Sequence, residues 1–245
     1  DRYNMNISNL FHRNWWAIFY FNFKMLPFSQ AIKLPFDFFG PVRFPSLKGK
    51  VIINCTVTRH MVEFGRAESE IFPSECSTIS IKGNLIINGK GNSFGSGIIL
   101  EINEGAQMIL NNDLLNAPRT KFIIKKGINI GNHVRISWES QIFDSNFHYI
   151  RNTKTGEIPP IHKEIKIGDY VWVGNRVTIN KGTQIPNHSI VASNSLCNKN
   201  YTKEQKEYVT IAGSPAKIIA EGYERIFESM EYELCQKLSQ RETIE

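Results

Sequence analysis

The sequence predicts a mainly β solenoid, in which short strands stack coil upon coil along one axis. Two observations carry this prediction. The 245 residues include 33 Ile but only 12 Leu, and a β-branched excess favours strands because stiff side chains suit a pleated surface better than a helix. Apolar residues also recur every six positions through the middle of the chain, a period that neither a coiled coil nor an alternating strand–helix fold produces.

The six-residue period is clearest in two runs, one counted from Ile130 and the other from Ile167. Their apolar members are Ile130, Ile136, Ile142, Ile167, Val173, Ile179, Ile185, Val191 and Cys197. The residue four positions after each of these is usually small or β-branched, as at Val134, Val171 and Val177. Two inward positions around one outward position, followed by a corner, describe a short strand and a change of direction. Three such strands need 18 residues and close a triangular coil, with successive coils about 4.8 Å apart.

The expected corners carry residue types that tolerate a positive φ or pre-set a turn. They are the pairs Gly131-Asn132, Gly168-Asp169, Gly174-Asn175 and Pro186-Asn187. A glycine-rich stretch over residues 83–97 lacks the strand, Gly-x-x-x-x-Gly-Lys-Ser/Thr and helix order of a phosphate-binding loop, so we assign its glycines to corners of earlier coils.

Segments at the two ends of the solenoid are expected to cover its exposed strand edges. Residues 1–75 form an aromatic-rich cap with the first strands, residues 76–217 the solenoid, and residues 218–245 a C-terminal helix. In that helix Ile226, Met230, Leu234 and Leu238 recur every four positions, which predicts one apolar packing face. The N-terminal aromatic residues are expected to pack against the prism, with peripheral contact to a membrane as the alternative.

Charge and cysteine content narrow the class of protein. The net charge of +6 comes without a dense run of Lys and Arg, which disfavours a nucleic-acid-binding protein. Cys55, Cys76, Cys197 and Cys235 lie far apart, which favours free thiols and a reducing compartment such as the cytoplasm or the inner face of its membrane. The longest apolar run near the start has 7 residues, too few to span a bilayer.

The repeat is interrupted once, over residues 149–166, which we expect to leave the prism as a loop. The position in phase just before this loop holds His148 instead of an aliphatic residue. A neutral imidazole can accept a proton from a hydroxyl, so His148 is a candidate general base, and Asp144 is its candidate orienting partner. The alternative is that His148 caps the last coil through a backbone hydrogen bond.

Two strings beyond the loop carry a family resemblance. Ile167-Gly168-Asp169-Tyr170-Val171-Trp172-Val173-Gly174 and Ala212-Gly213-Ser214-Pro215-Ala216-Lys217 resemble motifs of the hexapeptide-repeat O-acetyltransferases, in the branch that modifies sugars and capsular polysaccharides. The resemblance implies a left-handed parallel β-helix, a homotrimer, acetyl-CoA as co-substrate and a carbohydrate acceptor. It also implies that His148 is the catalytic base and that the indole of Trp172 assists it beside the thioester.

The resemblance further implies residues that bind CoA, and three other side chains are expected to contact the acceptor. Those that match family contacts to CoA are Gly174, Ala192, Ser193, Asn198, Lys199, Gly213 and Lys217. Those expected to contact the acceptor are Trp138, Tyr149 and His162. No metal is expected, because the histidines offer no closely spaced pair of zinc ligands. A non-catalytic scaffold or glycan-binding β-helix remains open, as does an enzyme that acylates a xenobiotic or an amino sugar.

Overall fold

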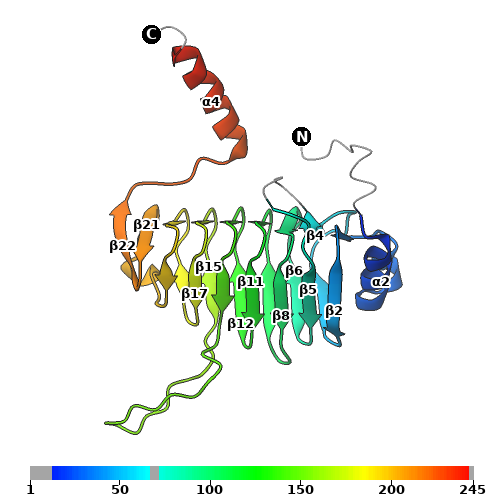
Figure 1. Cartoon of the computed structure of the whole chain (residues 1–245), viewed down its shortest axis with the longest axis horizontal. Coiled ribbons are helices and arrows are strands. Elements are labelled where there is room, and N and C mark those ends of the chain that lie inside the picture. The colour runs from blue at the N-terminus through cyan, green and yellow to red at the C-terminus, as the bar shows by residue number, and fades with distance from the viewer. Residues whose placement is uncertain (1–12, 67–71, 243–245) are drawn as a thin grey trace.

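The computed structural model describes residues 13–66 and 72–242. In this part of the chain the strands form three sheets that wrap around one axis as the faces of a triangular prism (Figure 1). Every strand pair within the coils is parallel, and only β21 (Val209–Gly213) and β22 (Ala216–Glu221) pair antiparallel, at the end of the prism. The predicted β solenoid is therefore confirmed.

The sheets are numbered in the order in which the chain visits them within a coil. Sheet 1 contains β1 (Phe36–Phe38), β4 (Val62–Arg66), β7 (Asn92–Gly95), β10 (Leu115–Asn116), β13 (Arg135–Ile136), β16 (Trp172–Val173), β19 (Ile190–Val191), β21 and β22. Sheet 2 contains β2 (Val42–Leu47), β5 (Ser77–Ile81), β8 (Ile99–Ile102), β11 (Lys121–Ile124), β14 (Gln141–Phe143), β17 (Thr178–Asn180) and β20 (Leu196–Cys197). Sheet 3 contains β3 (Lys50–Ile53), β6 (Asn84–Ile87), β9 (Gln107–Leu110), β12 (Gly127–Ile130), β15 (Ile165–Ile167) and β18 (Gln184–Ile185).

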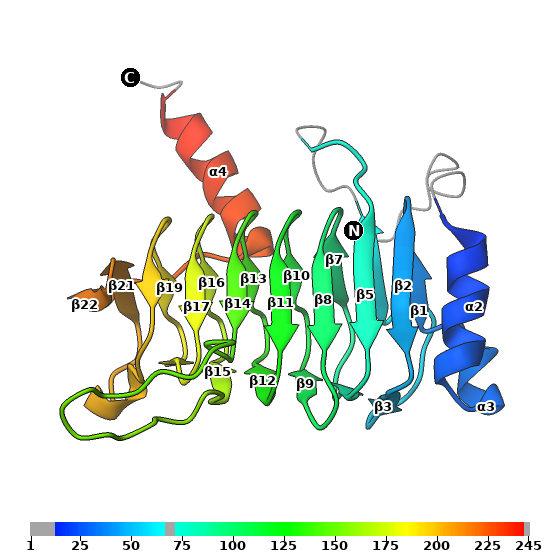
Figure 2. The ribbon, with the colours of Figure 1, turned by 60° about the horizontal axis from the view of Figure 1, so that its bottom comes forward.

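At the first end of the prism, α2 (Trp15–Met25) and α3 (Phe28–Ala31) cover the edge of the first coil (Figure 2). A short 3-10 helix spans Thr202–Glu204 near the other end. In contrast, α4 (Glu228–Glu242) rises away from the middle of the prism, where Glu228 pairs with Arg135 of β13 (Figure 1). None of the helices in the described ranges is long and apolar enough to cross a membrane.

The coils are not uniform in length. Residues paired on neighbouring coils are 18 apart from Trp172 to Ile190, the spacing that three hexapeptides give. They are 22 apart from Ser93 to Leu115, and 30 apart from Val62 to Asn92. The six-residue period is therefore regular only in the later coils, although stacking already begins at β1, inside the predicted cap.

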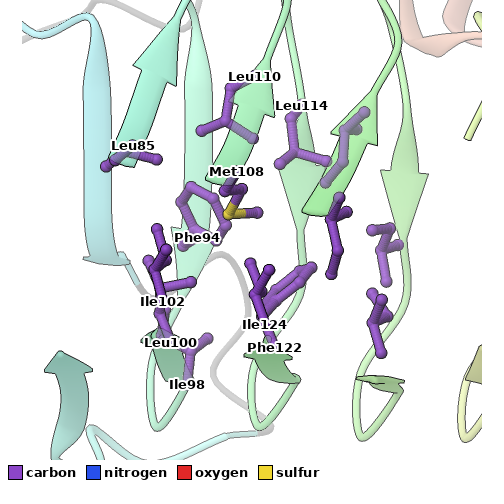
Figure 3. Packing of buried hydrophobic residues seen from close by; sticks show 14 of the residues in the cluster. Leu85, Phe94, Ile98, Leu100, Ile102, Met108, Leu110, Leu114, Phe122 and Ile124 are labelled. Atoms are coloured by element: carbon purple, nitrogen blue, oxygen red, sulfur yellow. The ribbon is translucent and has the colours of Figure 1, made fainter. Parts of the chain in front are cut away.

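The early coils are filled by aromatic side chains. The rings of Phe38, Phe64 and Phe94 stack along the axis at 5.4 and 4.8 Å between centroids, and Phe122 meets Phe94 edge-on at 5.9 Å. Figure 3 shows Phe94 and Phe122 among the aliphatic residues of the neighbouring strands. Longer coils enclose more space, so they need these larger side chains to reach the packing density of a protein interior.

The glycines at the later corners between sheets 3 and 1 do not supply the positive φ that the sequence predicted for them. The left-handed backbone at the corners between sheets 3 and 1 belongs to His133, Tyr170 and His188, with φ of 54–56°. Gly131 and Gly168 precede these residues by two positions, and a Cβ at either one would lie only 2.5–2.6 Å from atoms of the next coil. Glycine is therefore required there because the coils approach closely.

The C-terminal segment also differs from the predicted helix. Residues 216–221 form β22, and α4 begins only at Glu228. The predicted helix included this segment, although Glu221 and Gly222 separate its apolar residues from those of α4. Met230 and Leu234 remain 59% and 39% exposed, so the predicted apolar face is only partly packed against the prism.

Candidate active site

His148 lies outside the prism, five residues after the end of β14. Ile142 is the last fully buried residue in phase, Asp144 and Ser145 are still buried, and the chain then turns outward. The side chain of His148 is consequently exposed. The six-residue count predicted that it takes the place of an aliphatic residue in the core, and this prediction is wrong. An exposed imidazole at the base of a loop is accessible to a ligand from outside.

A tight turn positions His148. Its backbone N–H donates to the carbonyl of Asn146 at 2.7 Å, two residues earlier, and the residue between them, Phe147, has φ of 62°. Three-residue turns with a positive central φ are rare and strained, and strain of this kind concentrates at functional sites. The ring of Phe147 packs edge-on against Phe143 at 5.8 Å, which holds the turn on the end of β14.

Asp144 supports the prism instead of the imidazole. Its carboxylate accepts the backbone N–H groups of Lys125, Lys126 and Gly127 at 2.7, 2.7 and 2.6 Å, and its side chain is fully buried. These donors belong to the corner of the preceding coil. The expectation that Asp144 orients His148 is therefore wrong in its geometry, because the carboxylate is used by the backbone of another turn.

The two arms of the loop pair at their base. The N–H of Asn146 donates to the carbonyl of Ile161 at 3.1 Å, and that of Lys163 donates to the carbonyl of Asp144 at 2.9 Å. Between these bonds the Ser145 hydroxyl accepts the N–H of Phe147 and lies 2.9 Å from Nδ1 of His162.

His162 thus lies opposite Ser145 at the base of the loop. Tyr149, one residue beyond His148, is 76% exposed and free to contact a ligand. The structure therefore places three predicted residues, His148, Tyr149 and His162, around one loop base. Sequence reasoning missed Ser145, whose only signal is its place between the buried Asp144 and the turn.

Trp172 and Trp138 line a different part of the molecule. Together with the C-terminal segment they border a groove of about 650 Å³ on sheet 1, which also includes Arg225, Ile226 and Leu234. The indole N–H of Trp172 donates to the Ser137 hydroxyl at 3.4 Å, and the guanidinium of Arg225 lies 5.8 Å from the centre of its ring. The Trp172 side chain is still 36% exposed, so one side of it remains open.

An ion pair holds the C-terminal segment over this groove. Arg135, only 4% exposed, donates from Nε and Nη2 to the carboxylate of Glu228 at 2.7 and 3.0 Å, and from Nη2 to Asp113 at 2.8 Å. The bonds from Arg135 lower the pKa of Glu228 from 4.5 to about 2. Sequence reasoning missed this pair, although a charged residue between the two inward positions Val134 and Ile136 is a signal for an outward contact.

The depressed pKa predicts an acid-sensitive attachment of α4. The stabilisation from Glu228 is present above pH 4.5 and is lost as the pH falls toward 2, because the carboxylate is then protonated. We expect a fluorophore on Cys235, which lines the groove, to gain mobility over this interval in fluorescence anisotropy.

Labelling should be confined to Cys235 in a variant with Cys55→Ser and Cys76→Ser, because burial raises the pKa of the Cys197 thiol to about 11. The Arg135→Leu variant is the control, since its probe should be mobile already at neutral pH. An anisotropy that stays constant to pH 2 while circular dichroism shows intact β structure would contradict the prediction.

The candidate CoA residues divide between two corners. Gly174, Ala192 and Ser193 follow strands of sheet 1, and Gly213 is the last residue of β21 in the same sheet. Consecutive coils approach closely here, since a Cβ on Gly174 would lie 2.7 Å from the N of Ser193. Lys217 lies on the adjoining strand β22 and is exposed. By contrast, the exposed Asn198 and Lys199 follow β20, on the corner between sheets 2 and 3.

Within one chain, the loop that carries His148 and the groove that Trp172 lines lie on opposite sides of the prism. The loop with His148 leaves the corner between sheets 2 and 3, which in a three-sided prism lies opposite sheet 1 and therefore opposite Trp172. Figures 1 and 2 both show the loop and α4 on opposite sides of the prism. The predicted partnership of His148 with Trp172 is thus not formed within a single chain.

Comparison with known proteins agrees with this architecture. No family model matches the chain. Its stacked coils nevertheless have the fold of a left-handed parallel β-helix protein, which confirms the predicted fold class.

Two solved structures show this fold at 20% sequence identity. One is the polySia-specific acetyltransferase NeuO, with a TM-score of 0.54 and coverage of 79% of this chain and 79% of that chain. The other is the polysialic acid O-acetyltransferase OatWY, with a TM-score of 0.53 and coverage of 78% of this chain and 95% of that chain.

In the part of the chain that the structure describes, no group of three His, Cys, Asp or Glu side chains could hold a metal ion.

Proposed function

We propose that this protein is an acetyl-CoA-dependent O-acetyltransferase that acts on a hydroxyl group of a carbohydrate. The observation that carries the proposal is the exposed His148, held by a strained turn at the base of a loop on a rigid β-helix. Catalytic groups are commonly carried by loops that a rigid scaffold positions. The fold shared with two polysialic acid acetyltransferases supports the choice of a carbohydrate acceptor.

The separation of His148 and Trp172 supports a homotrimer. If three prisms stand side by side around a threefold axis, the corner that carries the loop of one subunit can face sheet 1 of its neighbour. His148 and Trp172 would then meet across the subunit boundary, together with the candidate CoA residues from both corners. The active site in this proposal is therefore shared between two copies of the chain.

The residues that would bind acetyl-CoA fit a long anionic ligand. Lys199 and Lys217 are exposed cations suited to phosphate groups. The Gly213 corner leaves room for a thin chain, since a Cβ there would meet only the carbonyl oxygen of Pro215, at 3.5 Å. Acetyl-CoA supplies an activated acetyl group on sulfur.

The chain's contribution to the chemistry is proton transfer. His148 would take the proton from the sugar hydroxyl as its oxygen bonds to the acetyl carbon, and would return that proton to the sulfur as the carbon–sulfur bond breaks. Water must be excluded to prevent hydrolysis, and the loop and the neighbouring subunit would cover the site.

The direct test is transfer of labelled acetyl groups from acetyl-CoA to a panel of sugars, nucleotide sugars and oligosaccharides that includes sialic acid polymers. Label on a hydroxyl of at least one carbohydrate supports the proposal. Transfer only to amines would redirect it to an amino-sugar or xenobiotic acyltransferase. If neither transfer nor binding occurs at millimolar CoA, the chain is a β-helix scaffold or glycan-binding protein.

A shared site predicts complementation between inactive variants. Chains with His148→Ala and chains with Trp172→Ala are each expected to lose most of their activity. Every trimer that contains both chains has one boundary of its three that pairs an intact His148 with an intact Trp172, so activity should return to about a third of the wild-type value. The measurement is acetyl transfer by trimers co-expressed and purified through two different tags.

A matched control is co-expression of the His148→Ala chain with a chain that carries the same substitution and the other tag. This pair should stay inactive. If the mixed His148→Ala and Trp172→Ala trimers also stay inactive, the two residues do not form one site across a subunit boundary.

A further inference from the structure

Helix α2 is apolar on two opposite faces. Ile18, Phe21, Asn22 and Met25 are buried, at helical spacings of three, four and seven residues. The exposed residues Trp16, Phe19, Tyr20 and Phe23 repeat the same spacing on the other side. A helix that is apolar all round is typical of an element with apolar surroundings on both sides. Here the outer side is largely exposed, and its only ring contacts with the prism are those of Trp16 and Tyr20 with Phe44, at 6.3 and 5.9 Å among the described residues.

The exposure of the second face is not the result of a loosely attached helix. Phe21 packs against Phe36 and Phe38 at 5.0 and 5.1 Å between ring centroids. Asn22 is fully buried, and its side-chain amide donates to the carbonyl of Phe36 at 2.8 Å and accepts the N–H of Phe36 at 3.1 Å. These contacts fix α2 on β1, so its outer face is presented in a defined orientation.

The outer face continues onto α3. Phe28 and Ile32 are 73% and 55% exposed, and the ring of Phe28 lies 6.0 Å from that of Phe23. Both helices lie at the end of the prism remote from α4 (Figure 2). We call this surface the N-terminal aromatic patch; its members are Trp16, Phe19, Tyr20, Phe23, Phe28 and Ile32.

The charge of the chain is concentrated in the same region. Residues 1–62 contain eight Lys and Arg and two acidic residues, Asp1 and Asp37, whereas residues 63–245 contain 21 basic and 21 acidic residues. Asp37 is buried and paired with Arg13 and His60, so it adds no negative surface. The basic residues that are exposed here are Lys24, Lys33, Arg43, Lys48, Lys50 and Arg59.

We propose that the N-terminal aromatic patch docks this protein onto the surface of an anionic lipid bilayer. Trp and Tyr are the side chains that favour the interface between water and lipid, and exposed lysines attract anionic headgroups. An 11-residue helix is about 16 Å long, which suits a helix that lies on a membrane but not one that crosses it.

The charge also decides between a bilayer and a second copy of the chain. Two copies that met through this patch would bring two strongly basic regions together, and their repulsion would oppose the contact. An anionic bilayer instead offers charge complementarity and an apolar phase at once. The docking surface lies far from the loop that carries His148, so this inference does not depend on the proposed enzymatic function.

The test is co-sedimentation of the full chain with phosphatidylcholine vesicles, with and without phosphatidylglycerol. We expect binding to the anionic vesicles that weakens as salt is added. The variants Phe19→Ser/Phe28→Ser and Lys24→Glu/Lys33→Glu should each bind roughly tenfold more weakly or worse. Matched controls at the other end of the prism, Ile219→Ser and Lys203→Glu/Lys237→Glu, should bind like the wild type.

A second measurement covers the case in which a patch variant fails to fold. Brominated anionic lipids should quench the fluorescence of the wild type more than that of Trp16→Phe, because Trp16 would lie in the interface. Absence of binding, or equal binding by the patch variants, would overturn the proposal. The proposal would also be overturned if the protein formed a larger assembly in the absence of vesicles and Phe19→Ser/Phe28→Ser abolished that assembly. The patch would then bind a second copy of the chain.

Discussion

Replacing His148 by Ala is expected to lower acetyl transfer by about 10² to 10⁴, the usual contribution of a general base. The substitution removes the group that takes the proton from the attacking hydroxyl. His162, the other imidazole of the loop, has its Nδ1 directed at the Ser145 hydroxyl at 2.9 Å. The fold should not suffer, because the His148 side chain is exposed and leaves no cavity. The measurement is the initial rate of labelled acetyl transfer, together with the affinity for CoA.

The affinity of the His148→Ala variant for CoA should stay close to that of the wild type, because the phosphate-binding candidates Lys199 and Lys217 are unchanged. Lys154→Ala is the matched control in the same loop, since Lys154 lies in the exposed turn at its tip, and this variant should retain its rate. A His148→Ala enzyme within tenfold of the wild-type rate would exclude this residue as the base.

The later coils could be predicted from sequence because their length equals three repeats. Ile167, Val173 and Ile179 are buried as the six-residue phase requires, and 18 residues separate equivalent positions on paired strands there. The early coils could not be predicted, because insertions at their corners shift the phase from one coil to the next. Phenylalanine also replaces isoleucine in their core, which removes the compositional signal.

The candidate site was predicted in its residues but not in its arrangement. The interruption of the repeat points to His148, and the second hexapeptide run points to Trp172. That these residues lie on opposite sides of one chain depends on which face each strand joins, and a one-dimensional period carries no such information. The role of Asp144 was also hidden, because its partners at 125–127 lie on another coil and no local pattern links them to it.

Asp144 is expected to be among the most sensitive positions for stability. Its buried carboxylate accepts three backbone N–H groups, and hydrogen bonds to a charged group contribute about 1.5–3 kcal/mol each. Asp144→Ala leaves these three donors without their partner at a position where the carboxylate itself is fully buried. We expect a loss of about 3–5 kcal/mol in the free energy of unfolding, measured by urea denaturation at fixed protein concentration.

Two further variants separate the effect of the buried carboxylate from that of any aspartate at a corner. Asp144→Asn keeps one carbonyl oxygen in place and should lose less than Asp144→Ala. Asp169→Ala removes a carboxylate that is only half-buried and accepts the backbone N–H of Asn132 at 2.6 Å, so about 1 kcal/mol is expected. Equal losses for Asp144→Ala and Asp169→Ala would mean that water replaces the carboxylate at residues 125–127, and that the base of the loop is not anchored by Asp144.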